Sequence, residues 1–248
     1  MLLQCEIQDA DARGAASWQR ANTIESLIEL NESCLALFAE QARATTGDGL
    51  LGQFGEQWKL LDAAGRRRAA ACHYLAFDAG FADPRRWQRP SPEAGAATAA
   101  AFFTVPGTAA LVQTVFLFGW HLARCQSTAA QLLLGMPAPC VALIAQRTLG
   151  QVRSLAAAHP EWLRPRWLGQ PRVWRELLMA ARTDDPSALW RARLRGQTLL
   201  AAETRACATE RLRYAPAFPL RRATMGASLP HPQQPGLPVP SAGMAVFE

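Results

Sequence analysis

Lysine is almost absent from this chain: of 26 basic residues in 248, Lys59 is the only lysine. A Cys-x-x-Cys pair is also lacking, since the six cysteines (residues 5, 34, 72, 125, 140 and 207) are widely spaced. No stretch reaches the roughly eighteen apolar residues of a membrane span, and the first ten residues contain acids, unlike a secretory signal. These absences predict a cytoplasmic protein without membrane contact, whose cysteines act as small buried apolar residues.

Residues at catalytic or metal-binding spacing are equally scarce. The single glycine of Leu134-Gly135-Met136 cannot cradle a pyrophosphate, and the pair Asp184-Asp185 is better explained as a turn. His121 and Cys125 are four residues apart, as in some metal sites, but a tetrahedral zinc needs two more ligands. The favoured interpretation is that the side chains of His121 and Cys125 both face the core. We therefore expect no enzymatic activity, no cofactor and no bound metal.

Alanine, leucine and arginine are abundant, and all three favour helices. Apolar residues recur at helical spacing along much of the chain, which predicts an all-α fold, a multi-helix bundle. A short strand or bend is expected near residues 74–81, and the prolines of 83–90 are expected to break any helix. The predicted helices cover about 22–44, 50–61, 62–74, 108–125, 127–134, 137–147, 149–158, 173–182 and 187–212.

These helices suggest a domain order. A weakly ordered N-terminus (1–20) precedes a first helical half (21–90), a linker rich in Ala, Pro and Gly (91–105) and a second helical half (106–171). Basic C-terminal helices (172–215) and a disordered Pro-rich tail (216–248) follow. Both halves end in a tryptophan among arginines and prolines, at 84–90 and 164–171. A duplication would give two pseudo-symmetric halves, although chance agreement between two segments rich in Ala, Leu and Arg gives the same pattern.

Positive charge is concentrated toward the C-terminus. The formal net charge is +6, and eight arginines between residues 164 and 195 face only three acidic residues. Arginine suits phosphate and carboxylate groups because its planar guanidinium can donate two parallel hydrogen bonds. There are two alternative explanations: a GC-rich genome would account for arginine in place of lysine, and a solvated helix face would account for the concentration of charge. The candidate DNA-binding or partner-binding residues are Arg164, Arg166, Trp167, Arg172, Trp174, Arg175, Arg191, Arg193 and Arg195.

The central segment carries a family resemblance. Phe116–Leu122, Ala129–Met136 and Leu149–Ala156 follow one another as leucine-rich and alanine-rich helices, and a basic and aromatic edge ends at Trp167. In this order and spacing, residues 111–167 resemble the D subunit family of the flagellar master transcriptional activator, and residues 24–87 resemble it more weakly. This chain is longer than that family and has Arg164-Pro165-Arg166 where its members have a linking cysteine.

The resemblance implies a helical dimerisation unit that works with a zinc-binding partner subunit to contact promoter DNA and recruit transcription machinery. With the basic C-terminal half, it predicts a bacterial transcription regulator, or an accessory subunit of a transcriptional activator. Such a subunit would contact DNA or a partner by neutralising phosphates rather than by reading bases. The alternative is a non-enzymatic helical adaptor that binds another protein and has no DNA role. A homo-oligomer is compatible with both hypotheses.

Overall fold

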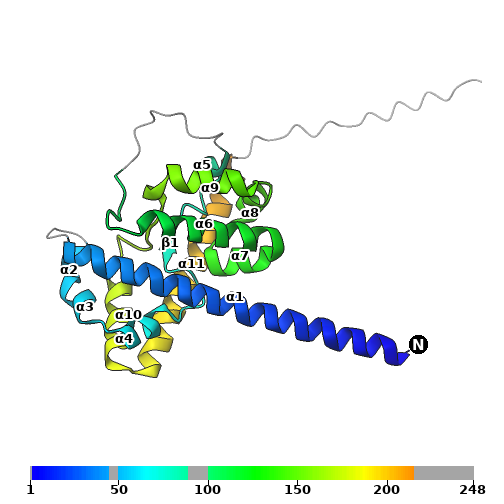
Figure 1. Cartoon of the computed structure of the whole chain (residues 1–248), viewed down its shortest axis with the longest axis horizontal. Coiled ribbons are helices and arrows are strands. Elements are labelled where there is room, and N and C mark those ends of the chain that lie inside the picture. Colours follow the sequence, from blue (N-terminus) through cyan, green and yellow to red (C-terminus); the bar gives the residue numbers. More distant parts are fainter. Residues whose placement is uncertain (1, 45–49, 89–99, 215–248) are drawn as a thin grey trace, which may run out of the picture. The chain divides into compact units, whose positions relative to one another are not determined.

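Helices make up most of the structure, a computed structural model that describes residues 2–44, 50–88 and 100–214, with side chains over 22–44, 52–88 and 100–207. The predicted all-α helical bundle is confirmed (Figure 1). Residues 91–99 of the predicted linker and the whole predicted tail (216–248) lie outside the described residues.

The elements follow one another in a simple order. In the N-terminal part they are α1 (Leu2–Ala44), α2 (Leu50–Gln53), α3 (Gly55–Leu60), α4 (Ala63–Ala70), β1 (Phe77–Asp78) and α5 (Pro84–Gln88). They continue with α6 (Thr108–Cys125), α7 (Ser127–Leu134), α8 (Ala138–Ala145), α9 (Leu149–Ala158), the 3-10 turn η1 (Pro160–Trp162), β2 (Arg164–Pro165), α10 (Pro171–Thr183) and α11 (Pro186–Tyr214). Strands β1 and β2 pair antiparallel, with Phe77 opposite Pro165.

Local capping chemistry explains most helix ends. The Asp62 side chain accepts a hydrogen bond from the Gly65 backbone N–H at 2.6 Å and starts α4. Thr148 and Gln151 form a reciprocal capping box at the start of α9. Gly135 ends α7 in the left-handed region at φ 68°. The turn predicted at residues 184–187 separates α10 from α11, where Asp185 accepts from the Ser187 N–H.

Several helix bounds differ from the sequence predictions. The predicted helix 62–74 ends at Ala70, so that residues 71–74 are not helical, and the predicted helix 50–61 is divided into α2 and α3.

Two further differences have local explanations. Helix α1 begins at Leu2 rather than near residue 22, because the predicted lead-in consists largely of good helix formers such as Ala, Glu, Gln and Arg. The segment 83–90 was expected to break any helix, yet α5 forms there. Pro84 occupies its first turn, where proline is tolerated because that N–H needs no helical partner, and Asp83 accepts from the Arg85 N–H at 2.9 Å.

One hydrophobic core contains residues from Leu27 to Leu200 and draws on both predicted halves, 21–90 and 106–171. Helix α1 packs against α3 and α4 on one side and α6 on another, and α6 contacts α7, α8 and α9 (Figure 1). Helix α5 of the first half packs on α8 of the second, and α10 of the C-terminal helices packs on α3 and α4 of the first half. The two tryptophan closures also differ, since Trp87 lies in a helix whereas Trp167 follows β2 at φ 54°.

Most of the non-helical segment between α4 and β1 is buried in this core, whereas His73 is exposed. Tyr74, Leu75, Ala76 and Phe77 are each at most 3% exposed. Without a helix, their backbone groups need partners from elsewhere. The Asn31 side chain of α1 supplies three: its Nδ2 donates to the Ala70 carbonyl at 3.2 Å and the Tyr74 carbonyl at 2.9 Å, and its Oδ1 accepts from the Ala76 N–H at 3.0 Å. The Leu75 N–H donates to the Leu133 carbonyl of α7 at 2.7 Å.

Replacing Asn31 with Ala should destabilise the protein strongly. The change leaves the buried Tyr74 carbonyl and Ala76 N–H without their partner, while the Ala70 carbonyl still accepts from the Cys72 N–H at 2.7 Å. We therefore expect a loss of about 2–4 kcal/mol in the free energy of unfolding. Urea denaturation monitored by circular dichroism measures it. The matched control is Ser33→Ala on the exposed side of the same helix, where we expect a change within about 0.5 kcal/mol. Equal stabilities of the two variants would contradict the role assigned to Asn31.

Alkaline pH should also weaken the fold. Burial raises the pKa of the Cys72 thiol from 9.0 to about 11, and it raises the pKa values of the buried Cys34 and Tyr74. A group with a raised pKa in the folded state contributes stability below its unfolded pKa, and this stability is lost as pH rises through the folded pKa. Between about pH 9 and 11, Cys34 and Cys72 should each cost roughly 1.4 kcal/mol per pH unit, and Tyr74, whose ordinary pKa is 10.0, should add to this only above pH 10. Urea midpoints across this window test the effect.

In that measurement, Cys72→Ala should show a shallower decline than the wild type, because one of the three titrating groups is gone. A midpoint that stays constant across the window in both proteins would contradict the prediction.

Candidate functional site

Three of the nine predicted binding residues are buried and cannot make surface contacts as they stand. Arg166 is 7% exposed, Trp167 is 8% exposed and Trp174 is 1% exposed. The Arg166 guanidinium donates to the Leu75 carbonyl at 2.8 Å and the Leu134 carbonyl at 2.7 Å. These residues were expected at a DNA or partner surface, but their side chains are almost fully buried. Arg166 lies beside the buried residues 74–76 and has a structural role there.

The surroundings of Arg166 make this role plain. Its backbone N–H donates to the Ala76 carbonyl at 3.1 Å, and its own carbonyl accepts from the Trp174 indole N–H at 2.7 Å. Glu203 of α11 lies 3.7 Å from the guanidinium. Partial burial raises the pKa of the Glu203 carboxyl, against the opposing effects of the Arg166 charge and the Trp167 N–H. Arg166 therefore joins β2, α7, α10 and α11 around one buried cation.

Arg193 is also largely structural. It is half-buried, and its Nη2 donates to the Arg68 carbonyl at 2.7 Å, which ties α11 to α4. Arg164 differs, because its side chain is 47% exposed and lies 3.4 Å from Asp78 across the β1–β2 pair. The remaining predicted residues, Arg172, Arg175, Arg191 and Arg195, are exposed on α10 and α11.

Two of these arginines, Arg191 and Arg195 of α11, border a groove between α10 and α11, which we call the hairpin groove. Its volume is about 540 Å³, and it is lined by Glu176, Met179, Ala180, Thr183, Ala188, Arg191, Ala192 and Arg195. Arg195 Nη1 lies 2.5 Å from Glu176 Oε1 across the groove. Arg191 forms no ion pair with any residue of the described part of the chain. The groove thus combines an alanine floor with a basic wall.

The exposed apolar residues of this hairpin were not among the residues predicted from the sequence. Met179 is 43% exposed, Trp190 is 64% exposed and Leu194 is 45% exposed. Trp190 and Leu194 are four residues apart and therefore share one face of α11. The sequence pattern could have identified Trp190 and Leu194. The buried positions of α11 follow helical spacing, and neither Trp190 nor Leu194 falls on that buried face; these positions are Leu189, Ala192, Gly196 and Leu200.

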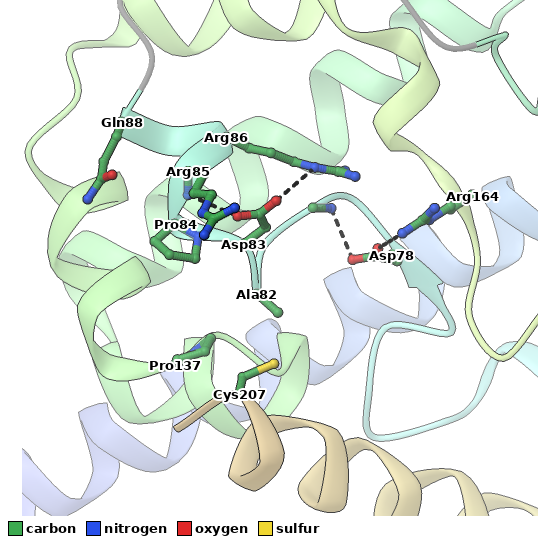
Figure 2. Close-up of a pocket in the computed structure, with 11 residues that line it drawn as sticks. Asp78, Ala82, Asp83, Pro84, Arg85, Arg86, Gln88, Pro137, Arg164 and Cys207 are labelled. Carbon is green, nitrogen blue, oxygen red and sulfur yellow. Dashed lines mark hydrogen bonds and ion pairs between the residues drawn. The ribbon is translucent and has the colours of Figure 1, made fainter. Parts of the chain in front are cut away.

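A second concave site lies between β1, α5, β2 and the C-terminal part of α11 (Figure 2). This cleft has a volume of about 710 Å³. Its charged walls come from Asp78, Asp83, Arg85, Arg86 and Arg164. Arg164 is the only predicted binding residue that lines it, whereas the other charges belong to segments read from the sequence as a bend and a helix break. Pro137 and Cys207 close its lower side in Figure 2.

The cysteines and histidines do not all match expectation. Cys34, Cys72 and Cys140 are buried as predicted. His121 and Cys125 were expected to face the core, but both are exposed on α6, with Cys125 Sγ 3.9 Å from His121 Nδ1. Among the described residues, no group of three or more His, Cys, Asp or Glu side chains is arranged to hold a metal ion.

Comparisons with models of protein families, with curated proteins and with solved structures found no match. In the described part of the chain, none of the helices has both the length and the apolar character that a membrane crossing requires.

The assignment of Arg166 to the core predicts a sharp contrast between two arginines. Arg166→Met leaves the Leu75 and Leu134 carbonyls without their donor, and should lower the free energy of unfolding by about 3 kcal/mol. Arg191→Met changes an exposed side chain and should lower it by less than about 0.5 kcal/mol. Thermal and urea denaturation of both variants provide the measurement. If both variants were equally stable, Arg166 would not hold the buried segment.

Proposed function

We propose that this protein is a non-enzymatic helical adaptor of the cytoplasm, which binds an acidic protein partner through the α10–α11 hairpin. The observation that carries the proposal is the hairpin groove with its basic wall, next to the exposed pair Trp190 and Leu194. Tryptophan, methionine and arginine are the residues most enriched at protein interfaces and at their energetic centres.

The shape of the groove favours a helical segment as the occupant. Two helices form its walls and small alanines form its floor, so that a third helix can approach closely. Amphipathic helices bind such grooves through apolar residues on one face. Acidic residues of the partner would meet Arg191 and Arg195, while an apolar residue would contact Met179. The expected partner is therefore an acidic amphipathic helix.

The Glu176–Arg195 ion pair fits this role. Both side chains are nearly half exposed, so the pair contributes little to stability. An incoming carboxylate can replace Glu176 as the partner of Arg195 at small cost. Arg175 is held differently, with its guanidinium 5.7 Å from the Phe54 ring centre. The hairpin thus has one cation that can exchange its partner, Arg195, and one that is held against an aromatic ring, Arg175.

A second candidate function is that of a transcription regulator or accessory subunit that contacts DNA. The exposed arginines 172, 175, 191 and 195 favour it, and so does the resemblance of residues 111–167 to the flagellar activator D subunit family, which implies a zinc-binding partner subunit. If all four arginines neutralise phosphates, the logarithm of the binding constant should fall with the logarithm of salt concentration at a slope of about −3.6. The acidic pair Asp184 and Asp185 at the tip of the hairpin counts against close approach to DNA.

Affinity capture from a native lysate tests the adaptor function. The double variant Arg191→Glu/Arg195→Glu should lose the captured protein by at least about tenfold, because like charges would then face its acidic residues. Trp190→Ala should weaken capture while leaving the fold intact, since Trp190 is largely exposed. The control is Arg153→Glu on the exposed surface of α9, which makes the same change of charge outside the groove.

A captured protein that binds the double variant as well as the wild type would sink the adaptor proposal. Fluorescence anisotropy with a mixed-sequence DNA duplex across a salt series separates the two candidates. Binding with the steep slope given above, abolished by Arg191→Glu/Arg195→Glu, would favour the DNA function. Salt-independent or undetectable binding would exclude it for the isolated chain.

A further inference from the structure

The cleft between β1, α5, β2 and α11 is a site of its own, distinct from the hairpin groove (Figure 2). We propose that it binds a small molecule through an oxyanion, a phosphate or carboxylate group, held by Arg85, Arg86 and Arg164. Its volume of about 710 Å³ lies within the usual range for small-molecule sites. The site does not depend on the adaptor function.

The lining has more donors than the protein itself can use. Each arginine has five N–H donors, and a carboxylate offers about four acceptor positions. Asp78 is already engaged by the Gly80 N–H at 3.0 Å and by Arg164, and Asp83 by the Arg85 N–H at 2.9 Å and by Arg86. Both carboxylates therefore already accept hydrogen bonds, and they cannot engage all the N–H donors of the three guanidinium groups. Several of these donors can bind a ligand.

The distances within the cleft support this balance. Arg164 Nη2 lies 3.4 Å from Asp78 Oδ2, and Arg86 Nε lies 3.4 Å from Asp83 Oδ2. These separations are longer than the 2.7–2.9 Å of a strong charge-assisted bond. The Arg85 guanidinium makes no hydrogen bond or ion pair with any described residue. An incoming anion thus meets one uncommitted guanidinium and two weakly committed ones.

One of the three cations is held in place before any ligand arrives. The Arg86 guanidinium lies 5.4 Å from the Trp162 ring centre, and its side chain is 27% exposed. Gly80 makes room for it, since a Cβ at that position would lie 2.8 Å from Arg86 Nη1. A cation fixed by an aromatic ring and a carboxylate loses less freedom on binding than a solvated arginine.

The rest of the lining indicates the kind of molecule that carries the anion. Ala82, Pro84 and Pro137 add apolar surface, and Gln88 adds an amide beside the arginines. A cation is disfavoured, because three arginines outnumber the two aspartates. The ligand is expected to have an anionic end and a compact, partly apolar body, as in a phosphate ester or a small polycarboxylate.

Isothermal titration calorimetry on the full chain at low ionic strength tests the site, with inorganic pyrophosphate and citrate as separate probes. We expect at least one to bind with a dissociation constant of roughly 1 mM or lower. Preference for pyrophosphate would identify a phosphate ligand, and preference for citrate a carboxylate ligand. Arg85→Gln should weaken binding by about tenfold or more, because it removes the charge and the donors of a guanidinium that no described residue engages.

The matched control is Arg153→Gln, which removes one exposed positive charge on α9. It should leave the dissociation constant unchanged within about twofold. Arg164→Gln provides a second variant at the opposite wall and should weaken binding as well. Undetectable binding of both probes to the wild type would overturn the proposal. Equal weakening by Arg85→Gln and Arg153→Gln would do so too, because it would show attraction by net charge alone.

Discussion

The buried backbone of residues 74–76 forms no helix, and groups from distant elements of the structure make its hydrogen bonds. A buried N–H or carbonyl without a partner costs more free energy than a typical hydrogen bond contributes. The Asn31 side chain of α1 bonds the Tyr74 carbonyl and the Ala76 N–H. The Arg166 guanidinium, just after β2, donates to the Leu75 carbonyl, and the Leu133 carbonyl of α7 accepts from the Leu75 N–H. Helices that are far apart in the sequence are thereby fixed to one central segment.

Close packing around this segment leaves no room for a side chain at two glycine positions. Helix α11 crosses Tyr74 at Gly196, where a side chain of any size would collide with the tyrosine hydroxyl. Helix α6 meets the Phe81 ring at Gly119, where a Cβ would lie 2.5 Å from a ring carbon. Aromatic rings fill the adjoining space, with Trp174 stacked on Phe38 at 5.9 Å. Polar pairing and aromatic packing therefore act on the same few residues.

Helices and their ends could be predicted from local sequence because caps act locally. Thr148, Gly135 and the turn at Asp184 ended or started helices at the predicted places. The differences at residues 2 and 84 also have local explanations. The early end of α4 at Ala70 does not, because residues 74–76 make their hydrogen bonds with distant parts of the chain. Whether the chain divides into two halves could not be predicted in this way either, because that depends on which helices contact each other across the sequence, and spacing within a helix carries no such information.

The candidate site was harder to predict for the same reason. Arg166 and Arg172 are both arginines in the same basic stretch, yet one is buried and the other is exposed. Only the distant carbonyls of Leu75 and Leu134 decide between them. The arginines that follow on α10 and α11 were correctly expected at the surface, apart from the half-buried Arg193. The cleft was missed because its charges come from short segments that meet only in the folded chain.

The position of Arg166 in the sequence also constrains how the protein is made. Contacts that connect distant parts of a chain form late, because a long loop must close first. During synthesis, the buried carbonyls of Leu75 and Leu134 have no guanidinium to pair with until the ribosome has released residue 166. The residues before Arg166 therefore cannot complete the hydrogen bonds of their core until Arg166 has been added. A nascent chain that stops before α10 exposes this partly folded core to chaperones and proteases.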